Sequence, residues 1–184
     1  MREITDLEEI KKIEYNILKE VHEFCVQNHL TYFLWGGTLL GAVRHNGFIP
    51  WDDDIDIAMP RESYDVLIHK FSESHFSVSA CTSDANYPFT YAKVYDANTR
   101  KLEPVYKDKT DLGINIDIFP IDGYISKNNL EKTVLKRDRL TKAWQRSNKS
   151  DNLTSFHHAL GTIYNHVIRF FYGDSNRIAN KINA

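Results

Sequence analysis

Residues 33–60 read FLWGGTLLGAVRHNGFIPWDDDIDIAMP, and the last third of this stretch carries four aspartates within five positions. Two of them, Asp54 and Asp56, alternate with Ile55 and Ile57. Side chains of a strand point alternately to its two faces. The pattern therefore predicts a strand that presents isoleucines to a core and both carboxylates to an open face.

Two carboxylates on one face repel each other, and each raises the pKa of the other unless a cation lies between them. Mg²⁺ is typically held by one or two carboxylates together with the phosphates of a substrate. We therefore expect Asp54 and Asp56 to bind Mg²⁺ or Mn²⁺. For the adjacent Asp52 and Asp53, a solvated acidic turn is an equally good interpretation.

A second acidic strand is predicted at NIDIF, where Asp117 lies between Ile116 and Ile118. An aspartate inside an apolar strand is costly to bury without a partner. If this strand neighbours the first one, Asp117 joins Asp54 and Asp56 as a third metal ligand. Three such carboxylates can hold one or two ions for phosphoryl displacement, so these aspartates are the expected catalytic residues.

A pair of glycines, Gly36 and Gly37, follows an apolar segment and precedes a predicted helix. In this position backbone N–H groups can approach a phosphate at the N-terminus of the helix. Thr38 could add a hydroxyl donor. The double glycine alone is a weak signal, and it gains weight from its place just before the acidic strand.

Four further residues are candidates for substrate binding. Arg44 suits a bidentate phosphate contact, and His45 could bind a phosphate or transfer a proton. Lys93, within YAKVYD, could reach a phosphate or could extend its stem along apolar surface. Trp51 could stack on a base or on a cationic head group, and a tryptophan buried in the core is an equally good interpretation.

The 184 residues are enough for one domain with a sizeable core. A formal net charge of −2 gives no electrostatic basis for binding nucleic acid. Two cysteines provide no disulfide framework and favour a reducing cytoplasm. No apolar run approaches about 18 residues, so any membrane contact is expected to be peripheral, at the inner face.

Strands and helices are mixed along the chain rather than regularly alternating, which favours an α+β fold with helices packed on a mixed sheet. A capping-box pattern of Thr5 and Glu8 predicts where the first helix begins. We expect helices over 5–29, 38–45, 61–71 and, in two segments, 128–172, and strands over 31–37, 54–59, 75–81, 91–96, 100–106 and 113–123.

The stretch WGGTLLGAVRHNGFIPWDDDIDIAMPRESYDVL strongly resembles the LicD family. This family belongs to the nucleotidyltransferase-like superfamily, which also includes the fukutin-related proteins. NIDIFPIDG resembles the family's second block, and the resemblance covers roughly residues 12–125. It implies a nucleotidyltransferase-like core over 1–125 and a helical extension over 126–184. The family's pattern falls here on Gly36, Gly37, Asp54, Asp56 and Asp117.

The resemblance also implies a function. LicD-type proteins transfer phosphocholine, and their relatives transfer other phospho-alcohols, from CDP-activated donors to sugars of teichoic acid, lipopolysaccharide or capsule. The expected partners are thus a CDP-alcohol and a glycan or lipid-linked glycan acceptor. Members of the family usually continue beyond this length, so we expect a fragment or a short member.

Two other functions remain open at this point. In a nucleotidyltransferase the attack would fall on the α-phosphorus of a nucleotide, and pyrophosphate would leave. The chain could also be a non-catalytic nucleotide-binding module. The closely spaced carboxylates of Asp54 and Asp56 repel each other, and a non-catalytic module has no need of such a cluster. The Asp54–Ile55–Asp56 sequence therefore argues against this last interpretation.

Overall fold

The structure is a computed structural model, and it describes residues 2–73, 75–80, 82, 87, 89–100, 112–123, 136, 139 and 140. The chain divides into two compact units. The first comprises 1–83, 91–102 and 111–122, and the second comprises 84–90, 103–110 and 123–184. The fold and the site below belong to the first unit. Most of the helical prediction for 128–172, and the strand predicted beyond residue 100, lie outside the described residues.

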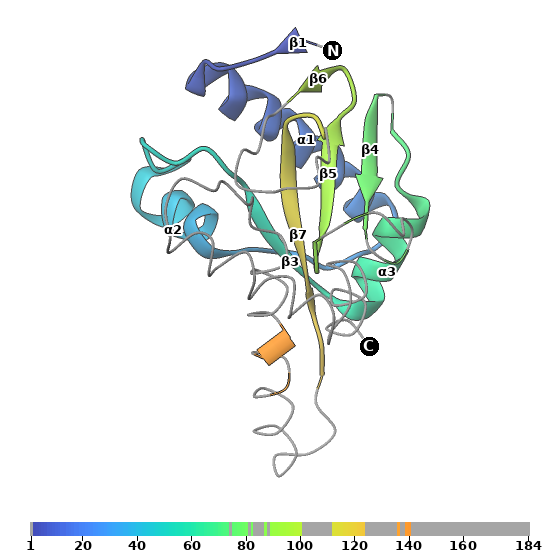
Figure 1. Cartoon of the computed structure of the whole chain (residues 1–184). Helices are drawn as coiled ribbons and strands as arrows, with labels where there is room; N and C mark the ends of the chain where they lie inside the picture. The colour runs from blue at the N-terminus through green and yellow to red at the C-terminus, as the bar shows by residue number, and fades with distance from the viewer. Residues whose placement is uncertain are drawn as a thin grey trace, which may run out of the picture. The chain divides into compact units, whose positions relative to one another are not determined.

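The first unit contains helices and strands in mixed order, which confirms the α+β prediction (Figure 1). Its elements in chain order are β1 (Arg2–Glu3), α1 (Leu7–Gln27), β2 (Phe33–Leu34), α2 (Gly36–His45), β3 (Asp56–Pro60), α3 (Arg61–Lys70), β4 (Phe76–Ser79), β5 (Ala92–Asp96), β6 (Thr99–Arg100) and β7 (Asn115–Ile121).

The main sheet has five strands in the order β2-β3-β7-β5-β4. β3 and β7 are parallel, and the other neighbouring strands are antiparallel. β7 is therefore the central strand, although it is the last of these five strands in sequence order. β1 and β6 form a separate parallel pair.

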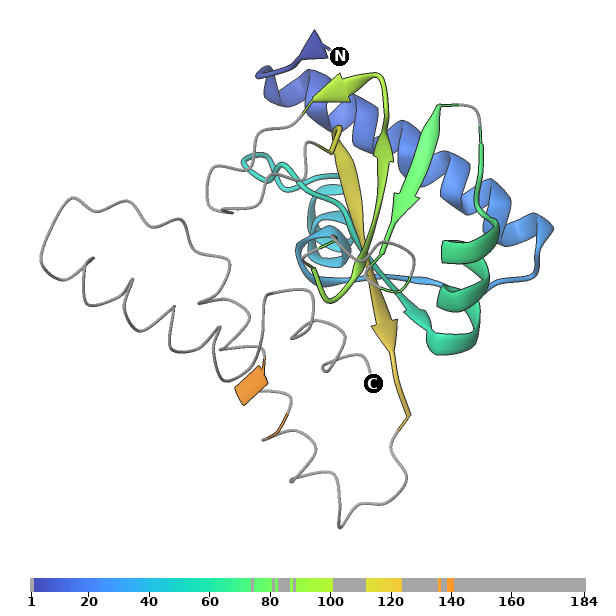
Figure 2. The ribbon, with the colours of Figure 1, turned by 45° about the vertical axis from the view of Figure 1, so that its right-hand side comes forward.

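One face of the sheet forms the core together with α1 and α3. Ile57 of β3, Val94 of β5 and Ile116 and Ile118 of β7 have no exposed surface and belong to a single apolar cluster. α1 contributes Ile17, Val21 and Phe24 to the same cluster, and α3 contributes Tyr64, Leu67 and Ile68. α1 passes behind β5 and β7 in both overall views (Figures 1 and 2).

The alternation of side chains along the strands then assigns the opposite face of the sheet. Asp56, Lys93 and Asp117 each lie next in sequence to a residue of the core face. Consecutive side chains of a strand point in opposite directions, so these three share the other face. The position of Asp56 agrees with the prediction that its carboxylate lies on the face away from the isoleucines, and Asp117 lies on the same face.

Two predicted strands differ in detail from the structure. β2 is a two-residue edge strand with Phe33 51% exposed, so it is shorter than the strand predicted over 31–37. β3 begins at Asp56, which leaves Asp54 and Ile55 in the preceding loop. The alternation predicted that Asp54 lies beside Asp56 on one face of a strand. Because Asp54 lies in the loop, strand geometry does not place it there.

The first helix begins later than expected. Asp6 rather than Thr5 is the N-cap of α1, and its carboxylate accepts a hydrogen bond of 3.1 Å from the backbone N–H of Glu9. An aspartate side chain caps as well as a threonine does, and it adds a negative charge at the positive end of the helix. Among the residues that the structure describes, no helix is both long and apolar enough to cross a membrane.

Candidate active site

A row of three charged residues crosses the middle of the sheet. In the strand register, Asp56 of β3 pairs with Asp117 of β7, and Asp117 pairs in turn with Lys93 of β5. The backbone N–H of Asp117 also donates to the carbonyl of Ile55 over 2.9 Å, just before β3 begins. Sheet pairing alone therefore aligns these groups, as we expected if the two acidic strands were neighbours.

Lys93 is 4% exposed and is held by two hydrogen bonds. Its ammonium group donates to Asp117 Oδ1 over 2.7 Å and to Asn115 Oδ1 over 2.9 Å. The amide of Asn115 in turn donates to the carbonyl of Gly113 over 2.8 Å. Lys93 neither extends to solvent nor stands alone, because its charge is paired with the carboxylate of the central strand.

The start of α2 is attached to Asp56. The hydroxyl of Thr38 accepts a hydrogen bond of 2.8 Å from the backbone N–H of Asp56. The N–H of Trp35 donates to the carbonyl of Asp56 over 3.0 Å. These two bonds attach Asp56, the first residue of β3, to the start of α2.

Both glycines at this N-terminus leave room for carboxylates. Gly36 has φ +52°, and a Cβ there would lie 3.1 Å from Asp56 Oδ2. A Cβ on Gly37 would lie only 2.6 Å from Asp52 Oδ2, which is too close. The double glycine therefore allows two aspartates to approach the backbone of α2 more closely than any side chain would permit.

The aspartates of the preceding loop gather beside this point. Asp52, Asp53 and Asp54 can each offer one carboxylate oxygen such that all three oxygens lie within 4.8 Å of one another. We call these residues, together with Asp56 and Asp117, the acidic cluster. The equal alternative for Asp52, a merely solvated turn, is less favourable because Asp52 contacts Gly37 of α2.

The electrostatics of the acidic cluster indicate an excess of negative charge. Burial, followed by the charges of Asp54 and Asp117, raises the pKa of Asp56 to about 6, although Lys93 opposes this. Burial also raises the pKa of Asp54, and the charge of Asp52 and its hydrogen bond add to the effect. Asp53 and Asp117 contribute smaller repulsions to the pKa of Asp54.

Mg²⁺ or Mn²⁺ suits the chemistry of this cluster. Carboxylate oxygens are the donors that such hard cations prefer, and several lie close enough to share one ion. A cation there would relieve the repulsion that raises the pKa of Asp56. That Asp54, Asp56 and Asp117 are its ligands stays a prediction, to which the geometry adds Asp52 and Asp53 as candidates.

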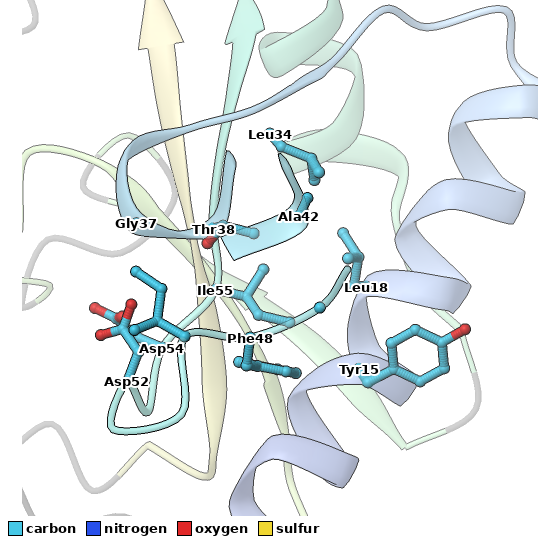
Figure 3. Close-up of a pocket in the computed structure, with 12 residues that line it drawn as sticks. Tyr15, Leu18, Leu34, Gly37, Thr38, Ala42, Phe48, Asp52, Asp54 and Ile55 are labelled. Carbon is cyan, nitrogen blue, oxygen red and sulfur yellow. The ribbon is translucent and has the colours of Figure 1, made fainter. Parts of the chain in front are cut away.

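A cavity of about 150 Å³ opens next to the acidic cluster (Figure 3). Its walls come from α1, β2, α2 and the loop between α2 and β3. Most of its lining is apolar, and Asp52 and Asp54 lie at one end, beside the hydroxyl of Thr38. The main apolar contributors are Tyr15, Leu18, Leu34, Ala42, Phe48 and Ile55.

Three predicted substrate-binding residues are exposed and make no described contact with Asp56 or Asp117. Arg44 and His45 are exposed in the last turn of α2, roughly 12 Å along the helix from Gly36. Trp51 is 79% exposed, so the alternative of a core tryptophan is wrong. Contacts of these three with a substrate stay predictions, and the described contacts do not join them to Asp56 and Asp117.

Asn115 and Asp52 are the residues that sequence reasoning undervalued. Asn115 lies two positions before Asp117, so the alternation that placed Asp117 on the open face also applied to Asn115. This signal was present and unused. The contact between Asp52 and Gly37 could not be found in this way, because it depends on how the loop folds back onto α2.

Comparisons with known proteins identify the family to which this chain belongs. Residues 29–156 match the LicD/FKTN/FKRP nucleotidyltransferase domain, and this range contains every residue predicted for the site. The chain belongs to the LicD family. The nucleotidyltransferase-like fold class and the family resemblance are thereby confirmed.

Among curated relatives, the chain is 34% identical over 146 residues to the lipopolysaccharide cholinephosphotransferase LicD of Haemophilus influenzae, covering 77% of this chain and 54% of that protein. It is 40% identical over 68 residues to an uncharacterized protein of Rickettsia prowazekii, covering 35% of this chain and 26% of the other.

A further relative, an uncharacterized protein of Caenorhabditis elegans, is 32% identical over 111 residues, covering 60% of this chain and 27% of its own length. The LicD chain described here thus spans about half the length of the Haemophilus relative and less of the others. No solved structure matches it significantly.

Proposed function

We propose that this LicD domain transfers phosphocholine from CDP-choline to a sugar hydroxyl of a cell-surface glycan, with Mg²⁺ or Mn²⁺. The acceptor hydroxyl attacks the β-phosphorus of the donor, the bond from that phosphorus to the oxygen bridging the two phosphates breaks, and CMP leaves. The Haemophilus relative is a lipopolysaccharide cholinephosphotransferase, which motivates the choice of choline phosphate as the transferred group and of lipopolysaccharide as the acceptor.

The observation that carries the proposal is the alignment of Asp56 with Asp117 across β3 and β7, next to the N-terminus of α2. It combines a cluster of carboxylates with a helix terminus whose glycines permit close approach. Transfer of a phosphoryl group requires positioning and charge compensation more than covalent chemistry from the protein. An acidic cluster beside a glycine-rich helix terminus is suited to both tasks.

In this proposal the residues have distinct roles. Asp54, Asp56 and Asp117 hold the cation, which would neutralise negative charge on the donor diphosphate. Lys93 fixes the orientation of Asp117 through its 2.7 Å bond. Gly37 lets Asp52 lie against the start of α2, beside the N–H groups that would bind a donor phosphate. Asp54 or a neighbouring carboxylate of the cluster accepts the proton of the acceptor hydroxyl.

The test is calorimetric titration of CDP-choline into the chain with and without Mg²⁺, alongside CDP-ribitol, CDP-glycerol and CTP. We expect Mg²⁺-dependent binding of CDP-choline that Asp54→Asn abolishes. Asp65→Asn on α3 is a matched control, because its exposed side chain lies outside the acidic cluster. Tight binding without Mg²⁺, or equal binding by Asp54→Asn, would exclude this assignment.

The name of the matching domain also supports nucleotidyl transfer as a second candidate. The acidic cluster would serve an attack on the α-phosphorus equally well. The products distinguish the two reactions. Release of CMP from CDP-choline with a lipopolysaccharide acceptor supports phosphocholine transfer, whereas release of pyrophosphate from CTP supports the alternative.

A further inference from the structure

We propose that the cavity between α1, α2 and the loop before β3 receives the trimethylammonium head of the donor alcohol. We call it the head-group cavity. This inference rests on the proposed function, and it adds the part of the molecule that would distinguish choline from a polyol. Tyr15 and Leu18 of its wall precede the segment that matches the family domain, so that match assigns them no role.

The lining of the head-group cavity has the character that a quaternary ammonium group requires. Such a cation carries no N–H group, so it binds through apolar contact, aromatic faces and nearby negative charge. Tyr15 and Phe48 provide two aromatic rings, and Asp52 and Asp54 provide negative charge at one end (Figure 3). The described residues that line the cavity include no lysine and no arginine.

The same lining is poorly suited to ribitol or glycerol. Each buried hydroxyl of a polyol needs a hydrogen-bond partner, and a missing partner costs roughly 1–3 kcal/mol. The side wall formed by Leu18, Leu34, Ala42 and Ile55 offers only apolar side chains. Thr38 Oγ1 accepts a bond from the backbone of Asp56, so its hydroxyl has one O–H left to donate, which is fewer partners than a polyol needs. The cavity therefore favours an apolar cation over a polyol of similar size.

The location of the cavity fits a donor whose phosphates lie at the acidic cluster. Gly37 and Asp54 line the cavity, and they also belong to the site, since Gly37 lies against Asp52 and the charge of Asp54 acts on Asp56. A head group attached to the β-phosphate could thus enter the cavity while the diphosphate stays at the cluster. The volume of about 150 Å³ is below that of a pocket for a whole drug-sized ligand, and it suits one small group.

Ala42→Leu is the decisive variant, because Ala42 is a small, half-buried residue of α2 that lines the cavity. A leucine there would fill part of the space meant for the head group. Val43→Leu is the matched control, since Val43 is the next residue of the same helix and is 74% exposed. Both variants receive a good helix former.

We would titrate CDP-choline, CDP and CDP-glycerol into the wild type and both variants with Mg²⁺, after checking folding by circular dichroism. Ala42→Leu should weaken CDP-choline by about tenfold, the loss of roughly 1.4 kcal/mol, and should leave CDP within about twofold. Val43→Leu should change neither ligand.

A second comparison avoids any risk that Ala42→Leu disturbs the fold. The wild type is titrated with the CDP ester of 3,3-dimethylbutanol, which replaces the quaternary nitrogen of choline by carbon. We expect this uncharged isostere to bind about fivefold more weakly than CDP-choline, in the range of a partly exposed cation–π contact. Tyr15→Leu, at a side chain that is 59% exposed, should remove part of that difference.

Each outcome has a defined meaning. Equal weakening of CDP and CDP-choline by Ala42→Leu would place the cytidine in the cavity and overturn the inference. An unchanged affinity for CDP-choline, or equal binding of the carbon isostere, would overturn it as well. Normal Mg²⁺-dependent binding of CDP with no advantage for CDP-choline refutes the head-group cavity alone. Failure of CDP itself to bind with Mg²⁺ refutes the proposed function.

Discussion

Asp56 is held by hydrogen bonds to its backbone and is subject to the charges of neighbouring carboxylates. Its backbone is fixed by α2 on one side and by the sheet on the other, which holds its side chain near the other carboxylates. Burial and the charges of Asp54 and Asp117 raise its pKa to about 6. A carboxylate held in this way destabilises the folded chain at neutral pH unless a cation is bound.

This destabilisation has a defined pH dependence. The pKa of Asp56 is about 6 in the folded chain, and it is about 3.9 in the unfolded chain. The folded state therefore binds more protons between these values, and the stability contributed by the protonated group is lost as pH rises from about 4 to about 6. Below that range the contribution is fully present.

The first prediction follows for Asp56→Asn. In buffer with EDTA at pH 7, this variant should be about 1 kcal/mol more stable than the wild type, after discounting for partial exposure. The difference should vanish near pH 4. Urea denaturation at both pH values measures it, with Asp65→Asn as the control. Mg²⁺ should stabilise the wild type and not the variant, and a variant that loses stability at pH 7 in EDTA would contradict this account.

The second prediction concerns Lys93. Replacing it by methionine keeps the apolar stem and removes the charge that bonds to Asp117. Leaving one member of a buried ion pair without the other costs about 3–5 kcal/mol. We expect Lys93→Met to lose about 3 kcal/mol in chemical denaturation.

The double variant Lys93→Met/Asp117→Asn tests the cause of that loss. It should recover part of the stability, because the buried carboxylate is then neutral. If the single and double variants are equally destabilised, the loss comes from packing or from Asn115 rather than from the ion pair.

At the scale of elements, the helix α2 depends on a glycine for its contact with the loop before β3. The third prediction is that Gly37→Ala displaces the carboxylate of Asp52, which lies 2.6 Å from the position of the added Cβ. The affinity for Mg²⁺, measured by calorimetry, should fall by fivefold or more. Gly47→Ala is the control, because a Cβ at Gly47 meets nothing within 4 Å.

The sequence predicted the position of a helix or strand well where the pattern of apolar residues arises within that element alone. The apolar period of α3 and the alternation along β7 were readable because each element buries one face against the same core. The predicted strand end at 59 and helix start at 61 lie within one residue of the end of β3 and the start of α3. Local signals thus located most elements to within a few residues.

Sequence reasoning failed where the structure depends on partners distant in the chain. The bond from Lys93 to Asp117 exists only because β5 pairs with β7 in one register, which no local pattern specifies. Asp54 was assigned to a strand because it continues the alternation, yet it has no pairing partner in the sheet and lies in the loop. The pairing of Asp56 with Asp117 was expected if the two strands were neighbours, whereas the bond from Lys93 to Asp117 was not expected.

At the scale of the whole first unit, stability depends on the central strand. Ile116 of β7 has no exposed surface and belongs to the cluster that joins the sheet to α1 and α3. The fourth prediction is that Ile116→Ala costs about 2–5 kcal/mol in urea denaturation, the usual range for such a truncation in a core.

Ile121 of the same strand gives the control, since it is 40% exposed. Ile121→Ala should cost less than about 1 kcal/mol, because little apolar surface is lost. Similar losses for the two variants would mean that β7 is stabilised by its hydrogen bonds rather than by its packing.

The central place of β7 also has a consequence for synthesis of the protein. A nascent chain that has emerged only to residue 114 contains β2 with β3 and β4 with β5, but it lacks the strand that joins the two pairs. Pairing between segments so distant in sequence is slow, because the intervening loop must be closed first. Asp56 thus acquires its partner Asp117 only after the ribosome has released both halves of the sheet. A chain that has emerged only to residue 114 therefore lacks one of the carboxylates proposed to hold the cation.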